Sequence, residues 1–435
     1  MALVLSKYSY LFEREGNFFL YAPLSNSFAE IDRETYDCLL AAQKGTACLH
    51  NMDAEVEEVL RKMKVVGVND ELEINKLKVN HLLHRFNPRH LYLTINPTLA
   101  CNFACPYCFE ASHPADFMTD EVENSIIAFI QQRVHVTQLH VNWFGGEPLL
   151  AFNRIITLSK RMQNLGLKYN AGMITNGYLL TPDKAKLFEE LQISSIQITI
   201  DGSEHTHNTR RFLKGGGPTY QTILKNIEET CKYSPRTFIS VRVNIDKTNG
   251  DEFFEVLSYF REYAEKYPNV FVNPGFVNDL SGSDRNHCLY DKEAMAAFLQ
   301  KAYYQHRYYA PYLYPANLVH ACAARNPNAI VIGPSGELYK CWNDVGNPDR
   351  SYGNVDGSLN HEDVLYEYLI KADHLNDTKC NACTFFPVCD GGCPYQRIQN
   401  EKTGRPQDTC SLFKEYANDF LILRYKNKLN GKDYF

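Results

Sequence analysis

Six short apolar segments, each followed by a helical pattern, constrain the fold of this chain more than any other feature. The segments cover residues 91–95, 139–144, 171–175, 196–200, 238–245 and 270–276. In the helical stretch over residues 119–134, Thr119 can cap the first turn, and Val122, Ile126 and Ile130 form one apolar face. Strands that alternate with helices favour a parallel sheet with right-handed crossovers. We therefore expect the α/β class and a partial (β/α)6 barrel of the TIM type.

The regions on either side of this alternation differ from it. Residues 8–13, 18–22 and 28–31 have the pattern of short strands, and residues 33–43 and 53–65 that of helices. After about residue 310, Gly, Pro, Asn and Asp become frequent around clustered cysteines, so that metal would have to impose the fold there. We expect a small β+α domain over residues 1–85, the barrel over 86–310, and a loop-rich domain over 311–435.

Charge and cysteine content limit the possible partners. The net charge is −6 and there is no long run of Lys or Arg, which argues against nucleic acid and anionic membranes as partners. The first residues lack a basic segment, and no apolar run approaches the ~18 residues of a membrane span. We expect a cytoplasmic protein, in which fourteen cysteines indicate metal binding rather than disulfides.

The first cysteine cluster follows the first predicted strand. Cys101, Cys105 and Cys108 lie within eight residues, and Tyr107 precedes the last of them. Three thiolates can hold three corners of a 4Fe–4S cluster and leave its fourth iron open to another ligand. Zinc is the alternative, but a tetrahedral zinc site needs four ligands. The C-x3-C-x2-C pattern with its aromatic residue resembles the signature of the radical SAM superfamily.

This resemblance implies a reaction and a set of cofactor ligands. In the superfamily, the open iron chelates the methionine moiety of S-adenosylmethionine (SAM), and an electron from the cluster releases a 5′-deoxyadenosyl radical. Cys101, Cys105 and Cys108 correspond to the cluster ligands, and Tyr107 to a residue beside the adenine. Later residues resemble SAM-binding positions: Gly145, Gly146, Glu147 and Pro148 as the GGEP segment, Thr175 and Asn176, Asp201, and Arg242. Outside the GGEP segment, a turn, cap or salt bridge explains them equally well.

Seven further cysteines resemble the SPASM domain, which holds two auxiliary 4Fe–4S clusters. They are Cys322, Cys341, Cys380, Cys383, Cys389, Cys393 and Cys410. The resemblance implies one cluster on Cys380, Cys383, Cys389 and Cys410. The other would be held by Cys322, Cys341 and Cys393, with an open position, a substrate thiolate or Cys288 as its fourth ligand. Structural zinc at Cys380 and Cys383 is the alternative.

Radical SAM proteins with SPASM domains act mostly on peptides and proteins. They include anaerobic sulfatase-maturing enzymes, and maturases that install thioether or carbon–carbon crosslinks in ribosomal peptides. The sulfatase-maturing group has an Asp directly after the second SPASM cysteine, whereas Trp342 follows Cys341 here. Asp344 is the nearest candidate for a general base, although it also fits a plain turn.

The N-terminal region resembles in pattern the winged-helix-like domain that captures leader peptides by strand addition. We therefore expect a peptide maturase that carries out a two-electron oxidation. Its partners would be a leader-bearing peptide and a flavodoxin-type or ferredoxin-type reductant. A sulfatase-maturing enzyme and a non-catalytic electron carrier are the alternative functions.

Overall fold

The computed structural model describes residues 3–46, 49, 52–108, 115–277, 289–310, 314–316, 322–404 and 407–429. Cys288, one of the alternative cluster ligands, lies outside these ranges. None of the helices in the described ranges combines the length and the apolar character that a membrane span requires. The chain divides into two compact units: the first comprises Met1–Phe86, Leu299–Asn326 and Tyr368–Phe435, and the second comprises Asn87–Phe298 and Pro327–Glu367. Helix α10 (Lys292–His306) contributes residues to both.

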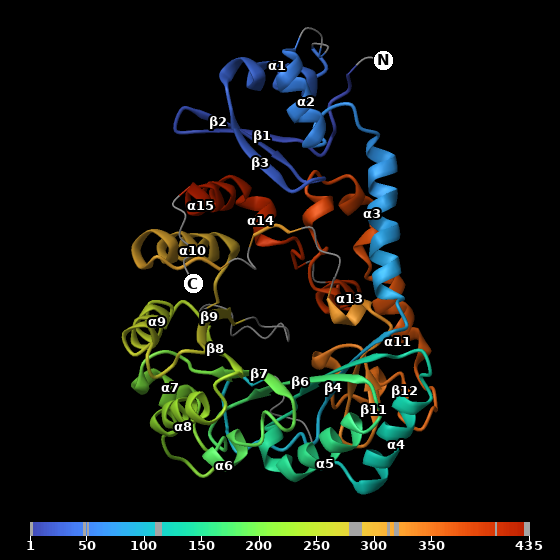
Figure 1. Ribbon diagram of the computed structural model, residues 1–435, viewed down its shortest axis with the longest axis vertical. Coiled ribbons are helices and arrows are strands. Elements are labelled where there is room, and N and C mark those ends of the chain that lie inside the picture. The colour runs from blue at the N-terminus through green and yellow to red at the C-terminus, as the bar shows by residue number, and fades with distance from the viewer. Residues whose placement is uncertain are drawn as a thin grey trace. The chain divides into compact units, whose positions relative to one another are not determined.

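A parallel sheet forms the centre of the second unit (Figure 1). Its strands are β4 (His90–Ile95), β5 (Gln138–Trp143), β6 (Lys168–Thr175), β7 (Ile193–Thr199), β8 (Phe238–Ile245) and β9 (Val270–Phe276), adjacent in this order. Every neighbouring pair among them is parallel. All six predicted strands are confirmed, and so is the α/β class with a barrel-type parallel sheet.

Helices connect these strands and cover one face of the sheet (Figure 1). They are α4 (Asp120–Gln131), α5 (Phe152–Gln163), α6 (Pro182–Ala185), α7 (Glu204–Arg210), α8 (Tyr220–Tyr233) and α9 (Glu252–Glu262). Helix α4 begins where the sequence predicts, because the Thr119 hydroxyl accepts a hydrogen bond from the Val122 N–H at 3.4 Å. Ile126 and Ile130 on its predicted apolar face are buried.

Three short strands extend this sheet beyond β4. They are β10 (Ala329–Ile332), β11 (Glu337–Tyr339) and β12 (Gly353–Asn354), and α11 (Glu362–Tyr366) follows them. β10 pairs in parallel with β4, while β11 and β12 continue as antiparallel neighbours. The sequence predicts that this region belongs to the C-terminal domain, because its pairing with a strand more than 200 residues away leaves no local signal. Cys341, which follows β11, therefore belongs to the same unit as the parallel sheet.

The first unit begins with the predicted small β+α domain. Strands β1 (Tyr10–Arg14), β2 (Asn17–Ala22) and β3 (Ser27–Ile31) form an antiparallel sheet in that order, and helices α1 (Arg33–Gln43) and α2 (Ala54–Lys62) follow it. Asp32 and Asp53 cap these two helices through their carboxylates. Leu20 of the sheet, Leu39 of α1 and Leu60 of α2 lie in one buried core.

The remainder of the first unit consists of helices of 4 to 16 residues, several of them joined by cysteine-bearing loops. Its helices are α3 (Asp70–Arg85), α12 (Thr378–Asn381), α13 (Pro394–Thr403), α14 (Leu412–Glu415) and α15 (Ala417–Leu429). The sequence analysis did not identify α3. Arg325, 1% exposed, donates to the backbone carbonyls of Ala372, Asp390 and Gly392. One buried guanidinium thus joins loops that have little regular structure of their own.

Candidate functional site

The loop that carries Cys101, Cys105 and Cys108 directly follows β4, and all three thiols are partly buried. The Ala104 N–H donates to the Phe212 carbonyl at 3.0 Å, so the segment after α7 helps to hold the loop. Burial raises the pKa of Cys101 to about 11 and also raises the pKa of Cys105. Because iron binds the thiolate form, cluster binding at this loop would release protons.

Two glycines after β5 let the backbone pack against the cysteine loop. At Gly145 (φ +109°) an added Cβ would lie 2.2 Å from the Thr98 carbonyl oxygen. At Gly146 it would lie 2.4 Å from the carbonyl oxygens of both Leu99 and Ala100. These obstacles are backbone atoms, which cannot rotate away as a side chain can. The GGEP glycines are therefore needed to set the position of the segment leading into Cys101.

Glu147 joins the ends of β5 and β6. Its carboxylate is fully buried and accepts hydrogen bonds from the Leu149 N–H (3.0 Å), the Thr175 hydroxyl (2.7 Å) and the Asn176 N–H (2.7 Å). Burial raises the pKa of this carboxyl group, although these hydrogen bonds oppose the rise. Pro148 begins the short helix that Glu147 caps. The predicted SAM-binding residues Glu147, Thr175 and Asn176 are thus brought together, and they bond to one another.

A polar network surrounds Tyr107 at the end of the cysteine loop. The Tyr107 hydroxyl donates to Asp201 Oδ2 at 2.5 Å and accepts from Arg211 Nη1 at 2.8 Å. Arg210 pairs with the same Asp201 oxygen at 3.1 Å, and its guanidinium carbon lies 5.1 Å from the centre of the Tyr107 ring. Asp201 is fully buried, and its Oδ1 has no hydrogen-bond partner among the described residues. Such an acceptor fits a donor supplied by a cofactor, for example a ribose hydroxyl.

Two further predicted residues of this unit, Arg242 and Asp344, have partners within the protein. Arg242 lies on the face of β8 opposite the buried Val241 and Val243, as predicted, and its Nε donates to Asn244 Oδ1 at 2.8 Å. Asp344 is 2% exposed and forms an ion pair with Arg350 Nε at 3.2 Å. This buried pair accounts for the Asp344 carboxylate without a catalytic role. The general-base role of Asp344 stays a prediction. The buried environment of the carboxylate favours the alternative, a structural ion pair.

We expect Gly146→Ala to lower the rate of SAM cleavage about 100-fold, because the loop must move by about 1 Å to admit the methyl group. The rate of 5′-deoxyadenosine release by the reconstituted protein measures this loss. Gly215→Ala is a matched control, since nothing lies within 4 Å of the Cβ added there. Equal rates for Gly146→Ala and wild type would show that SAM cleavage does not require the close approach of the Gly146 backbone to the segment before Cys101.

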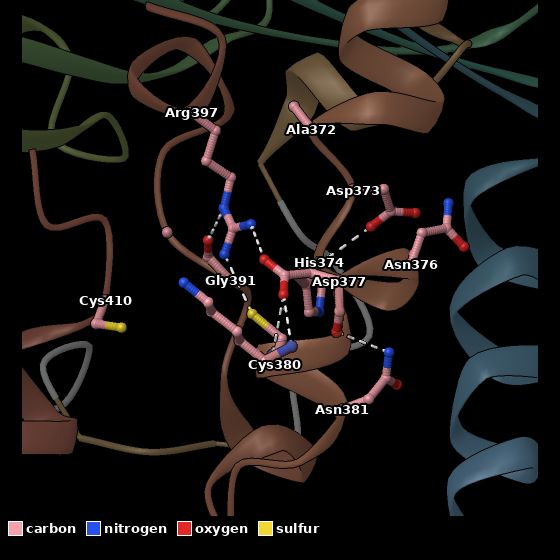
Figure 2. Close-up of polar contacts among 12 residues, drawn as sticks. Ala372, Asp373, His374, Asn376, Asp377, Cys380, Asn381, Gly391, Arg397 and Cys410 are labelled. Carbon is pink, nitrogen blue, oxygen red and sulfur yellow. Dashed lines mark hydrogen bonds and ion pairs between the residues drawn. The ribbon is translucent and has the colours of Figure 1, made fainter. Parts of the chain in front are cut away.

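Within the first unit, four cysteines line one cavity of about 470 Å³: Cys380, Cys383, Cys389 and Cys410. These are the four residues predicted to hold one auxiliary cluster. At Gly392 (φ +71°) an added Cβ would lie 1.8 Å from the Thr409 carbonyl oxygen, so glycine lets the loop after Cys389 approach the segment before Cys410. In Figure 2 the Cys410 side chain points toward the space beside Cys380 and Arg397.

The cavity fits an iron–sulfur cluster better than a single metal ion. A zinc ion needs its thiolate ligands about 2.3 Å away. Among the residues that the structure describes, no three His, Cys, Asp or Glu side chains come together closely enough to hold one ion. The four cysteines instead line one cavity together, and a cubane cluster takes one cysteine at each of its four irons.

Donors approach three of these sulfur atoms. Arg397 Nη2 lies 3.2 Å from Cys380 Sγ, the Gly391 N–H donates to Cys389 Sγ at 3.3 Å, and Lys414 Nζ lies 3.6 Å from Cys410 Sγ. Positive charge and N–H groups beside sulfur suit thiolates that carry negative charge. The sequence analysis missed Arg397 and Lys414. Lys414 follows Cys410 by four residues. This spacing is the one local feature of the sequence that could have identified either donor.

The other predicted cysteine set is divided between the units. Cys322 and Cys393 belong to the first unit and Cys341 to the second, so neither unit alone holds all three. Burial raises the pKa of Cys393, and the nearby Cys322 adds to the rise. The Cys341 sulfur accepts from the Asn343 side-chain amide at 3.7 Å.

Comparison with known proteins gives a family and several relatives. Residues 95–260 match the family model described as the radical SAM superfamily. The chain is 23% identical to a serine-type anaerobic sulfatase-maturating enzyme of Bacteroides thetaiotaomicron, over 73% of this chain and 85% of that protein. It is 22% identical to the radical SAM cyclopropyl synthase TigE of Paramaledivibacter caminithermalis, over 90% of this chain and 89% of that one.

Among solved structures, Streptococcus suis SuiB bound to its precursor peptide SuiA is similar in fold. The TM-score is 0.52 at 14% sequence identity, and the match covers 91% of this chain and 97% of SuiB. The family match begins at the last residue of β4, includes all three cysteines of the first loop and ends within α9. The radical SAM fold implies SAM and a 4Fe–4S cluster as cofactors. Residues 95–260 thus form a radical SAM domain, and the chain that carries this domain is an enzyme.

Proposed function

We propose that this enzyme is a peptide maturase that removes two electrons and two protons from a ribosomally made peptide and leaves a thioether, a carbon–carbon crosslink or a related oxidation. Cys101, Cys105 and Cys108 hold a 4Fe–4S cluster, which when bound supplies the electron that cleaves SAM to the 5′-deoxyadenosyl radical. Tyr107 and Asp201 line the SAM site, where the free Asp201 Oδ1 accepts a ribose hydroxyl.

The observation that carries this proposal is the N-terminal domain. β3 is an edge strand of the three-stranded sheet, so one side of its backbone is available to pair with an added strand. A leader peptide that pairs with this edge raises the effective concentration of the attached core peptide at the radical site. The match to SuiB, which was solved with its precursor peptide, covers 91% of this chain and supports the same reading.

A second candidate function is sulfatase maturation, which the relative from Bacteroides thetaiotaomicron favours. That reaction uses an Asp after the second SPASM cysteine, where this chain has Trp342. Trp342 is 38% exposed and its ring packs on Phe144 at a centroid distance of 4.7 Å, and Asp344 is held in its buried ion pair. These contacts favour the peptide maturase, because they leave the general-base position without a carboxylate.

The proposal also includes two auxiliary 4Fe–4S clusters. Cys380, Cys383, Cys389 and Cys410 hold one, and Cys322, Cys341 and Cys393 hold the other, so that the second substrate electron has an acceptor. The substrate loses one hydrogen atom to the deoxyadenosyl radical, which becomes 5′-deoxyadenosine. It then loses one electron to an auxiliary cluster and one proton to the solvent, so that atoms and electrons balance. We place the enzyme in the cytoplasm, where thiols stay reduced and a flavodoxin-type or ferredoxin-type protein serves as the reductant.

Incubation with precursor peptides encoded by neighbouring small reading frames tests the function. The anaerobically reconstituted enzyme, SAM and a strong reductant are expected to yield 5′-deoxyadenosine and a peptide lighter by two hydrogens that does not react with an aldehyde probe. A sulfatase-derived peptide serves as the comparison. An aldehyde-reactive product from that peptide alone would favour the formylglycine-forming alternative.

Leader binding should slow amide hydrogen exchange in β3 at least tenfold, because strand addition gives its outward amides new partners. Hydrogen exchange followed by mass spectrometry, with and without a leader-bearing precursor, measures the effect. β8 is the internal control, since its two neighbours in the sheet, β7 and β9, already pair with it. Unchanged exchange in β3, combined with efficient modification of the peptide, would contradict leader capture at this edge.

A further inference from the structure

Arg397 uses three nitrogens at the cysteine-lined cavity. Its Nη2 donates to Cys380 Sγ at 3.2 Å, its Nη1 to Asp377 Oδ2 at 2.7 Å and its Nε to the Gly391 carbonyl at 2.8 Å (Figure 2). The side chain comes from α13, while Cys380 lies on α12. A planar guanidinium with three fixed partners has little freedom to swing away from the sulfur.

Asp377 positions both residues of this contact, Cys380 and Arg397. Its Oδ1 accepts from the N–H groups of Lys379 (2.8 Å) and Cys380 (3.2 Å), so it caps the helix that carries Cys380. Its other oxygen pairs with Arg397. The side chains of Arg397 and Asp377 are 17% and 28% exposed, so the solvent screens the charge of Arg397 less than that of a surface side chain.

The ion pair with Asp377 does not explain why Arg397 also points at a sulfur atom. One guanidinium and one carboxylate balance each other, yet the guanidinium is directed at a cysteine that the proposed function assigns to a cluster. A four-thiolate 4Fe–4S cluster is anionic and becomes more negative on reduction, and hydrogen bonds to its sulfurs are among the factors that set its potential. A cationic donor at such a sulfur favours the reduced state.

We propose that Arg397, oriented by Asp377, is a positioning residue that raises the reduction potential of the auxiliary cluster held by Cys380, Cys383, Cys389 and Cys410. The inference rests on the proposed function, because it needs that cluster to be present. The cluster accepts an electron more readily as a result, which suits an acceptor of the second substrate electron. Lys414 acts in the same direction on Cys410, but its exposed side chain contributes less.

A redox titration monitored by electron paramagnetic resonance tests the proposal on the full chain. A Cys105→Ala, Cys393→Ala background removes a proposed ligand from each of the other two clusters, which simplifies the signal. Arg397→Gln is expected to keep its iron and to lower the equilibrium constant for one-electron reduction at least tenfold, which corresponds to about 59 mV. Arg397→Lys keeps the charge without the planar guanidinium, so its reduction potential should lie between those of the parent protein and Arg397→Gln.

Two further variants separate orientation from charge. Asp377→Asn retains an oxygen for the helix cap and loses the carboxylate that orients Arg397. Loss of the negative charge alone would raise the potential, so a potential below that of the parent protein reports a displaced Arg397. Lys402→Gln is the matched control, because Lys402 carries the same charge on the same helix and is exposed. Its potential should equal that of the parent protein.

Failure of this inference and failure of the proposed function would give different experimental results. If a Cys389→Ala variant had the same iron content as wild type, no cluster would be bound at this site, and this part of the proposed function would be refuted. A cluster that is present, with equal potentials in the parent, Arg397→Gln and Asp377→Asn, would overturn the inference and leave the proposed function standing. A loss of iron in Arg397→Gln, with an unchanged potential in iron-loaded Arg397→Lys and Asp377→Asn, would also overturn it.

Discussion

Cys105→Ala is expected to abolish 5′-deoxyadenosine formation, with a loss of at least about a thousandfold. The thiol lies in the loop after β4, and it is one of three that hold the proposed SAM-binding cluster. With two thiolates left, the cluster loses a corner, and the site loses the electron source for SAM cleavage. Release of the nucleoside under strong reductant, per mole of protein, measures the effect directly.

Iron analysis of the same preparations makes this result specific. Three clusters correspond to about twelve irons per chain, and Cys105→Ala should lose about four of them. Cys231→Ala is the matched control, because Cys231 is a buried cysteine of the same unit that lies on α8, away from the loop. The radical SAM assignment of this loop would be refuted by a Cys105→Ala protein that cleaves SAM at the wild-type rate.

The sequence predicts the elements whose signal is local. The strands β4 to β9 are short apolar runs bounded by helical patterns, so each can be identified without its neighbours. The capping of α4 by Thr119 is equally local. The first cysteine motif is local too, because its three cysteines lie within eight residues, whereas the division of the seven later cysteines between two clusters rests on the resemblance to the SPASM domain.

Features set by tertiary contacts are not predictable in this way. The pairing of β10 with β4 joins residues more than 200 positions apart, so the short apolar run of β10 does not reveal its partner. Asp344 looks available in a turn-like segment, yet Arg350 occupies its carboxylate. Asp377 stands three residues before Cys380, which is the position of a helix cap, but its pairing with Arg397 depends on the packing of α13 against α12.

A second large effect is expected on stability: Asp373→Ala should lower the free energy of unfolding of the first unit by about 3–5 kcal/mol. Asp373 Oδ2 lies 2.5 Å from Arg85 Nη1, and both side chains are only 5% exposed. Removal of the carboxylate leaves a buried guanidinium at the end of α3 without its counter-charge. Hydrogen exchange in α3 reports this local stability.

Two comparisons show that burial of the charge is the cause. Asp37→Ala breaks an ion pair with Arg33 whose side chains are 61% and 79% exposed, so it should cost less than about 1 kcal/mol. The double variant Arg85→Leu, Asp373→Leu should cost less than Asp373→Ala, because no unpaired charge stays buried. A double variant less stable than Asp373→Ala would contradict this account.

The same region gives stability a defined dependence on pH. Burial lowers the pKa of His81 to about 4, so the unfolded chain takes up a proton before the folded one does. Stability is therefore lost as the pH falls from about 6.5 toward 4, by an amount on the order of 1 kcal/mol or more. His81→Phe should remove this part of the pH dependence of exchange in α3.

Asp373 acts at lower pH and with the same sign. Burial alone would raise the pKa of its carboxyl group, but His374 and Arg85 hold it well below its usual range. Its contribution is present above the unfolded pKa of about 3.9 and is lost as the pH falls through the folded value. The stability difference between wild type and Asp373→Ala should therefore stay constant from about pH 8 to about pH 5 and shrink only in stronger acid. A difference that already shrank near pH 6 would place the proton on a different group of this cluster.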